Sequence, residues 1–259
     1  MIYGRSYVKT YADSDVNAFI IASGITDELQ TDSIDYLITN LKSNNLWSKM
    51  QAVYPMVGST ATNHKFNAKN PIDTDTAFRI MFTGGTHSAN GFSGNGTGYG
   101  NTYFIPALIQ NVNSNGVTLA IGTEGTGVQE LEIGSAFSGT ERSTLGSRVS
   151  GDLFVARFNG SNQTFANTDG KGIYTGQRTG ATISNSWKNG IKKQTNNSGG
   201  TLPNFSFYIG ALNNNGSVAN RSIKRIQSVY IHQGLTDIEV PALHTIINTY
   251  ENMLNRKTW

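Results

Sequence analysis

The feature that most constrains this fold is a long central stretch, from about residue 51 to residue 231, dense in turn-forming residues. The chain of 259 residues contains 29 Gly and 28 Asn, the residue types that most readily adopt positive φ. Frequent turns imply many short strands, and all-β sandwiches of this length often form one domain. Aromatic residues make up 10% of the chain, which argues against disorder. We therefore predict a mainly β, antiparallel β-sandwich.

Within this stretch, several short segments have the pattern of strands. Each alternates in polarity or runs apolar between Gly, Asn or Pro residues. The predicted strands are 77–82, 116–121, 151–158, 204–211 and 223–232. The turn-rich segments 84–101, 134–147 and 159–172 are predicted to connect them.

Helical periodicity appears only at the two ends of the chain. The segment Asp15–Ser23 predicts a short helix that stops at Gly24, and a second apolar stripe follows at helical spacing. This stripe consists of Ile34, Leu37, Ile38 and Leu41. We predict an N-terminal arm and helical lead-in over residues 1–50, joined in one structural unit to a sandwich over residues 51–259.

The C-terminal segment carries the clearest helix signal. Thr236 and Glu239 fit a capping box, in which hydroxyl and carboxylate satisfy amides of the first turn. The apolar face that follows is formed by Leu243, Ile246, Ile247, Tyr250, Met253 and Leu254. Arg256 and Lys257 lie where the dipole of a helix C-terminus favours cations.

Composition excludes several classes of function. The net charge is +3, but the 20 Lys and Arg residues are scattered, whereas a nucleic-acid site needs them clustered on one face. The chain has no Cys, which excludes disulfides and thiol chemistry. Met1–Thr10 lacks the apolar core of a signal peptide, and no apolar run approaches the ~20 residues of a membrane span. We expect neither nucleic acid nor membrane as a partner.

One pair of carboxylates is compatible with catalysis. Glu130 and Glu132 are two residues apart, which in a strand places both on one face, as in glycanases that carry acid and nucleophile on one strand. Ser135 stands where such a pattern has its third carboxylate. The alternative interpretation places both carboxylates on the solvent side of an amphipathic strand, with Leu131 and Ile133 inside.

The remaining chemistry-bearing residues follow no known site pattern. The four histidines, His64, His87, His232 and His244, are far apart in sequence and lack metal-ligand spacing. The sequence also lacks a Gly-x-Ser-x-Gly elbow and a phosphate-binding loop. We predict no catalytic residue, no metal site and no cofactor.

The segment 84–101 is a candidate for ligand binding, because its seven Gly and three Asn make it costly to order. Rings in and beside it can stack on a sugar face, and amides can bind hydroxyl groups. The candidate residues are Phe92, Asn95, Tyr99, Asn101 and Tyr103. Alternatively, these rings plug the edge of the sandwich and the glycines let the loop fold back.

The second half of the chain resembles the laminin-G-like or concanavalin-A-like sandwich family. The residues that carry the resemblance are Trp187-Lys188-Asn189-Gly190, Phe205–Ala211, the strand at 226–231 and the ending Gly234–Glu239. The first of these looks like the family's strand, Asn-Gly turn and strand. The resemblance covers about 75 residues. It implies a jelly-roll sandwich with a C-terminal helix.

The first half resembles a recurring module of tailed-bacteriophage virion proteins. The matching segments are Ala18-Phe19, Ile25-Thr26-Asp27, Leu41-Lys42, Leu46–Met50, Val53-Tyr54-Pro55, His64–Asn67 and Gly84–Ser88. This resemblance implies a structural protein of the phage particle, in a head or tail fibre, a vertex or a decoration subunit. It also implies location in the virion after assembly in the bacterial cytoplasm.

The implied partners are other virion proteins, further copies of the same chain and a host-surface glycan. Two alternatives remain on the same fold: a free carbohydrate-binding lectin module and a glycan-degrading enzyme. The fold itself does not separate these three functions.

Overall fold

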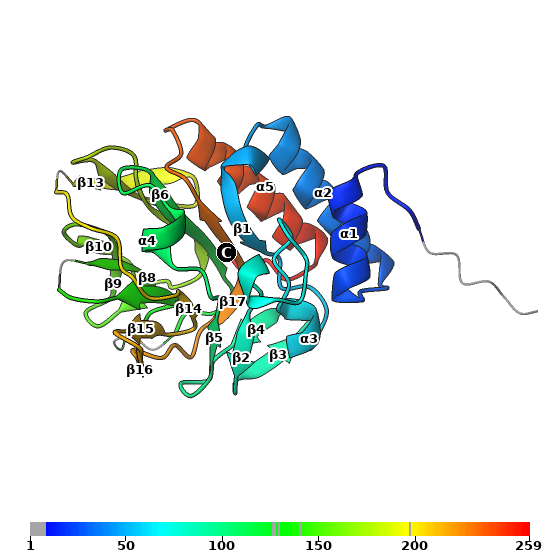
Figure 1. Ribbon diagram of the computed structural model, residues 1–259, viewed down its shortest axis with the longest axis horizontal. Helices are drawn as coiled ribbons and strands as arrows, with labels where there is room; N and C mark the ends of the chain where they lie inside the picture. Colours follow the sequence, from blue (N-terminus) through cyan, green and yellow to red (C-terminus); the bar gives the residue numbers. More distant parts are fainter. Residues whose placement is uncertain (1–8, 126–127, 129, 140, 197) are drawn as a thin grey trace, which may run out of the picture.

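A computed structural model describes residues 9–125, 128, 130–139, 141–196 and 198–259. Its strands form two stacked sheets, and a layer of helices lies against one of them (Figure 1). We call the sheet beneath the helices the covered sheet and the other one the open sheet. The predicted mainly β sandwich with helices at both ends is confirmed.

In the described residues the covered sheet has eight strands, in the order β13-β12-β11-β6-β17-β4-β3, with β1 also paired to β17. Every pairing in it is antiparallel. The strands are β1 (Met50–Tyr54), β3 (Thr86–Ser88), β4 (Gly91–Ser93), β6 (Asn115–Ile121), β11 (Gly172–Arg178), β12 (Ser184–Lys188), β13 (Ile191–Asn196) and β17 (Arg225–His232). Both β6 and β11 are buried along their whole length, because the sheet is packed on both faces.

In the described residues the open sheet has nine strands, in the order β10-β9-β8-β7-β14-β5-β2, with β15 and β16 attached at β7. They are β2 (Met81–Thr83), β5 (Tyr99–Asn101), β7 (Ile133–Ala136), β8 (Arg142–Val149), β9 (Leu153–Phe158), β10 (Gln163–Ala166), β14 (Tyr208–Ile209), β15 (Leu212–Asn214) and β16 (Ser217–Ala219). Burial alternates along β9, so this sheet has one buried and one accessible face.

Three longer helices form the helical layer: α1 (Ser14–Ser23), α2 (Glu28–Ser43) and α5 (Glu239–Met253). As predicted, α1 ends at Gly24, which has φ 68°. Asp27 caps α2, where its side chain accepts from the N–H of Gln30 (3.0 Å). The capping box is also confirmed, since Thr236 N donates to Glu239 Oε2 (2.8 Å) and Glu239 N to Thr236 Oγ1 (3.3 Å). Short helical turns are η1 (Trp47–Lys49), α3 (Ala61–His64), η2 (Asp75–Ala77) and α4 (Pro106–Ile109).

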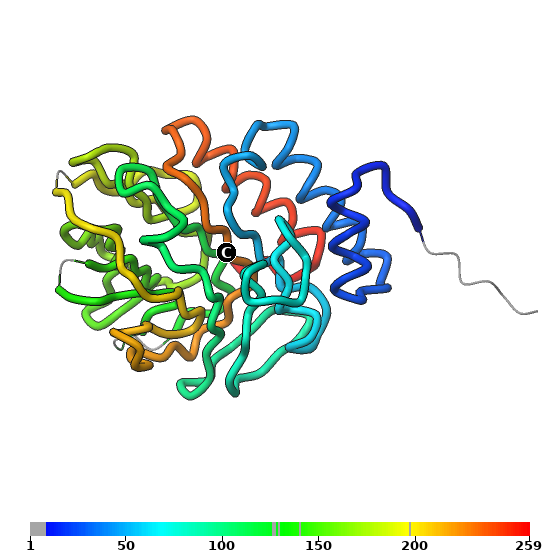
Figure 2. The backbone as a smooth tube through the Cα atoms, viewed as in Figure 1, coloured from blue at the N-terminus to red at the C-terminus, as the bar shows by residue number. Residues whose placement is uncertain are grey.

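Two hydrophobic cores hold the layers together. One lies between the helices and the covered sheet, where Leu37 of α2 and Leu243 of α5 join Trp187 and Tyr230 of the sheet. The other lies between the two sheets. Figure 2 shows α5, in red, between the blue lead-in helices and the sandwich. The core between the helices and the covered sheet contains residues of both predicted units, 1–50 and 51–259. The boundary between residues 50 and 51 stays a prediction.

Several segments predicted as turn-rich connections contain strands instead. The segment 84–101 contains β3, β4 and β5, the segment 134–147 most of β7 and β8, and the segment 159–172 contains β10. Conversely, the strand predicted over 204–211 is only β14, and that over 77–82 contains the last residue of the turn η2 and the start of β2. Among the described residues, no helix has the length and apolar character needed to cross a membrane.

Candidate functional site

Two of the five predicted ligand-binding residues, Phe92 and Asn95, do not form a ligand-binding surface with the other three. Phe92 was predicted to stack on a ligand, but it is fully buried, because β4 pairs with β17 and turns the ring into the core. There it packs against Phe82 at a centroid distance of 4.8 Å. Asn95 is exposed, but its carboxamide accepts from Ser93 Oγ (2.8 Å) and donates to Thr86 Oγ1 (3.2 Å).

The other three predicted residues lie together near one end of the open sheet. Asn101 of β5 faces Tyr208 of β14 in the sheet register, and the Tyr99 and Tyr208 rings are 4.7 Å apart. Asn101 Oδ1 accepts from Ser206 Oγ (2.7 Å) and from the backbone N–H of Tyr103 (3.0 Å). Burial, and the nearby Tyr99 and Tyr103, raise the pKa of Tyr208. We call Tyr99, Tyr103 and Tyr208 the tyrosine cluster.

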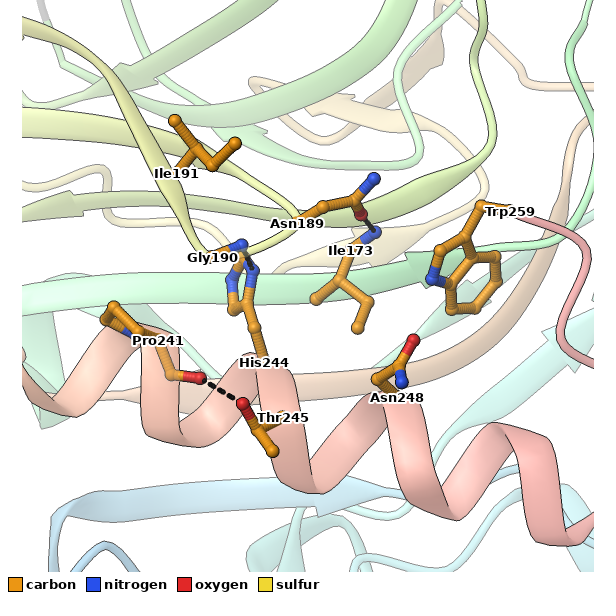
Figure 3. A pocket seen from close by; sticks show the side chains of 9 residues that line it. All are labelled: Ile173, Asn189, Gly190, Ile191, Pro241, His244, Thr245, Asn248 and Trp259. Atoms are coloured by element: carbon orange, nitrogen blue, oxygen red, sulfur yellow. Dashed lines mark hydrogen bonds between the residues drawn. The ribbon is translucent and has the colours of Figure 1, made fainter.

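A concave site lies between α5 and the hairpin of β12 and β13. The pocket has a volume of about 380 Å³, within the range of small-molecule sites (Figure 3). We call it the α5 pocket. It is lined by Ile173, Asn189, Gly190, Ile191, Pro241, His244, Thr245, Asn248 and Trp259.

The rim of the α5 pocket is fixed by the Asn189-Gly190 turn. Both residues have positive φ, 49° and 80°, as a tight two-residue hairpin requires. Asn189 Oδ1 accepts from the N–H of Ile173 (2.8 Å), and the N–H of Gly190 donates to His244 Nδ1 (2.7 Å). The turn is therefore tied both to the covered sheet and to α5, which gives the pocket a preformed wall.

Two side chains offer their polar groups to the α5 pocket. The carboxamide of Asn248 projects from α5 beside the Trp259 ring, and the indole nitrogen lies on the pocket side of that ring (Figure 3). Neither side chain makes a hydrogen bond to another residue within the described parts of the chain. Thr258 Oγ1 donates to the Gly122 carbonyl (3.0 Å), which anchors the segment that carries Trp259. The pocket thus combines an aromatic wall with an available amide.

The floor of the α5 pocket leads into a buried hydrogen-bond chain across the covered sheet. His244 Nδ1 accepts from Gly190, so its Nε2–H donates to Thr175 Oγ1 (2.7 Å). Thr175 Oγ1 lies 2.6 Å from Thr118 Oγ1, which lies 2.9 Å from His232 Nε2. His232 Nδ1 donates to the Gln233 carbonyl (2.7 Å). The chain is satisfied when both histidines are neutral.

The pKa values agree with this neutral chain. Burial, and to a smaller extent nearby His232, lower the pKa of His244 to about 3. Burial also lowers the pKa of His232 to about 4, against the opposing effects of the Gln233 carbonyl and Glu239. His244 is therefore a neutral structural residue of the pocket near pH 7.

The two candidate catalytic carboxylates are buried, and the prediction that they lie on the solvent side was wrong. Glu130 and Glu132 are 1% and 0% exposed, and both ion-pair with Lys224 Nζ, at 3.3 and 2.9 Å. Ser222 Oγ donates to both carboxylates, at 3.2 and 3.1 Å. Burial of both is possible because the Lys224 ammonium lies between them.

The described residues contain no group of three or more His, Asp or Glu side chains able to hold a metal ion. His64 and His87 do meet, with their Nδ1 atoms 3.0 Å apart, although they are distant in sequence. Asn248, Trp259 and Tyr208 were not predicted as site residues from the sequence. Periodicity places Asn248 on the polar face of a helix, but it does not reveal which ring lies opposite.

The fold is similar to that of several solved structures. Domain 4 of AbnA, a GH43 extracellular arabinanase from Geobacillus stearothermophilus solved in complex with arabinotriose, is 17% identical with a TM-score of 0.54. The match covers 76% of this chain and 98% of that domain. The botulinum neurotoxin serotype D binding domain is 11% identical with a TM-score of 0.52, over 80% of this chain and 52% of the other.

At these identities the similarity shows the fold and nothing beyond it. The jelly-roll, lectin-like sandwich predicted from the sequence is confirmed. No protein-family model matches the chain, and no curated protein matches its sequence.

Proposed function

We propose that the chain is a carbohydrate-binding module and that the α5 pocket holds a sugar residue of its ligand. The observation that carries the proposal is the pairing of the Trp259 indole with the Asn248 carboxamide in a preformed pocket of about 380 Å³. The similarity in fold to a domain solved with arabinotriose supports it. This is the lectin alternative of the sequence analysis.

The chemistry of the pocket suits a neutral sugar. The apolar face of a pyranose or furanose ring packs on an aromatic ring, while its hydroxyl groups need donors and acceptors at the edge. Trp259 and Ile173 supply the apolar contact, and Asn248 supplies one acceptor and two donors. His244 has both nitrogens engaged and its pKa is low, so it adds no charge near pH 7.

We further propose binding without turnover. The carboxylates of Glu130 and Glu132 are buried and ion-paired with Lys224, an arrangement that favours a structural role for both. Loss of polysaccharide hydrolysis on Glu130→Gln, in a chain that does show hydrolysis, would overturn this part of the proposal.

Glycan binding is tested by screening the chain on a glycan array and titrating hits by calorimetry. We expect Trp259→Ala and Asn248→Ala each to weaken binding at least tenfold, a factor that corresponds to about 1.4 kcal/mol. Both side chains are partly exposed, so neither change should unfold the protein.

The matched control is Tyr99→Ala in the tyrosine cluster, which should leave affinity within twofold if the α5 pocket is the site. The reverse pattern would contradict the pocket and assign binding to Tyr99, Asn101 and Tyr103 instead. No binding by the unaltered chain to any glycan would contradict the proposed function itself.

The virion role and its partners, including other copies of the chain, stay predictions from the sequence resemblance. The proposed lectin activity is compatible with a subunit that attaches a particle to a host-surface glycan. We expect the chain to co-purify with phage particles through density-gradient centrifugation. Its absence from particles of a phage that encodes it would contradict the virion role.

A further inference from the structure

The accessible face of the open sheet contains a second, smaller pocket, separate from the α5 pocket. Its volume is about 150 Å³, and it is lined by Glu130, Leu131, Arg142, Thr144, Val149, Val155, Asn162 and Asn220. The three longer helices pack against the other sheet. We call this second site the arginine pocket.

The strand register brings two arginines together at this site. Thr144 of β8 faces Arg157 of β9, and Arg142 is two residues from Thr144, so all three side chains share one face. Burial lowers the pKa of Arg157, and the charge of Arg142 lowers it as well. Arg142 therefore lines the pocket, and Arg157 lies beside it on the same face of the open sheet.

Neither cation is neutralised within the described parts of the chain, where no ion pair involves Arg142 or Arg157. Arg157 Nε donates to the Gly160 carbonyl. Arg142 Nε is buried and has no acceptor, a rare state that calls for an explanation. The adjacent acids are engaged, Glu130 with Lys224 (3.3 Å) and Glu141 with Thr201 Oγ1 (2.9 Å).

We propose that the arginine pocket binds the carboxylate of an acidic sugar. A carboxylate accepts two parallel hydrogen bonds from a guanidinium fork, and here it would relieve the repulsion between Arg142 and Arg157. The hydroxyl of Thr144 and the carboxamide of Asn162 are placed to contact the neighbouring sugar atoms. The small volume suits an anionic group held at the sheet surface, with the rest of the glycan outside.

This inference rests on the proposed function only in taking the ligand to be a glycan, because the site and its residues are different. The test measures chemical-shift changes on titration with methyl β-D-glucuronide, with methyl β-D-glucoside as the neutral comparison. We expect the glucuronide to bind at least tenfold more tightly, and Arg142→Gln or Arg157→Gln to abolish that difference. Arg142→Lys keeps the charge without the fork and should restore it in part.

The control variant is Arg79→Gln, which removes an equal charge from a surface ion pair with Asp73 and Asp75 and should change nothing. Equal binding of glucuronide and glucoside, or full binding by Arg142→Gln, would overturn the proposal. Inorganic sulfate that binds as tightly as the glucuronide would also overturn it, in favour of a free oxyanion. Trp259→Ala should leave the glucuronide preference intact, which separates this test from that of the α5 pocket.

Discussion

Lowering the pH from 7 to 5 is expected to destabilise the fold by about 2 kcal/mol for each of three buried histidines. These are His64, His232 and His244, whose pKa values are lowered from 6.5 to about 3, 4 and 3. Above about pH 6.5 they are neutral in both the folded and the unfolded chain. Below it only the unfolded chain takes up protons, so stability falls with pH until the folded-state pKa values are reached.

The hydrogen-bond geometry explains why protonation of these histidines is unfavourable in the folded state. A proton on His244 Nδ1 would face the N–H of Gly190, and a proton on His232 Nε2 would displace the hydroxyl hydrogen of Thr118. Among the described residues, the His64 ring has the Gly58 carbonyl (3.4 Å) and His87 Nδ1 (3.0 Å) as hydrogen-bond partners, and Arg256 is a nearby cation. In each case an added proton meets a donor or a positive charge.

Urea unfolding at pH 7, 6 and 5 measures the effect, with the fold intact at pH 7 as the reference. The paired variant is His244→Gln, whose amide can still accept from Gly190 and donate to Thr175. It should reduce the loss between pH 7 and pH 5 by about 2 kcal/mol, whatever its stability at pH 7. A free energy of unfolding that is constant over this range, or an unchanged slope in the variant, would contradict the explanation.

The sequence predicted those elements whose signal is local. Gly24 and the capping box of Thr236 and Glu239 mark helix ends by backbone geometry, and the Asn189-Gly190 turn does the same for a hairpin. The strands β6, β9 and β17 were also found, because their apolar residues fill the core between the sheets. In these segments a few consecutive residues are enough to specify the local structure.

The missed strands depend on contacts between distant segments. A Cβ at Gly176 of β11 would lie 2.3 Å from the Phe158 ring, and one at Gly134 of β7 would lie 2.8 Å from Leu212. These glycines let other strands pack closely, but in the sequence they look like turns. Arg256 is a similar case. It was predicted to follow a helix C-terminus, as it does, but the sequence did not indicate that it is 2% exposed and ion-paired with Glu251.

The candidate sites follow the same rule. Tyr99, Asn101 and Tyr103 are near one another in sequence, so one window contained them, whereas Tyr208 reaches them through strand pairing. Trp259 and Asn248 meet Ile173 only after α5 docks on the covered sheet. Arg142 and Arg157 are brought together by the register of β8 and β9. Each candidate site therefore combines residues that are distant in the sequence, and sequence patterns do not show that such residues meet.

Lys224→Met is expected to destabilise the protein by about 3–5 kcal/mol, the cost of removing one partner from a buried ion pair. The Lys224 side chain is fully buried, and its ammonium also donates to the Arg148 carbonyl (2.7 Å). Methionine fills the space of the stem but supplies no charge. Glu130 and Glu132 would then share a buried site without their cation.

Equilibrium unfolding in urea at pH 7 measures this loss, and Lys192→Met is the matched control. Lys192 ion-pairs with Asp237 at 2.9 Å on the surface, where such pairs contribute less than about 1 kcal/mol. The combined variant Glu130→Gln, Glu132→Gln and Lys224→Met removes all three charges and should be more stable than Lys224→Met alone. If Lys224→Met costs no more than Lys192→Met, the two carboxylates do not depend on this lysine, and their burial needs another cause.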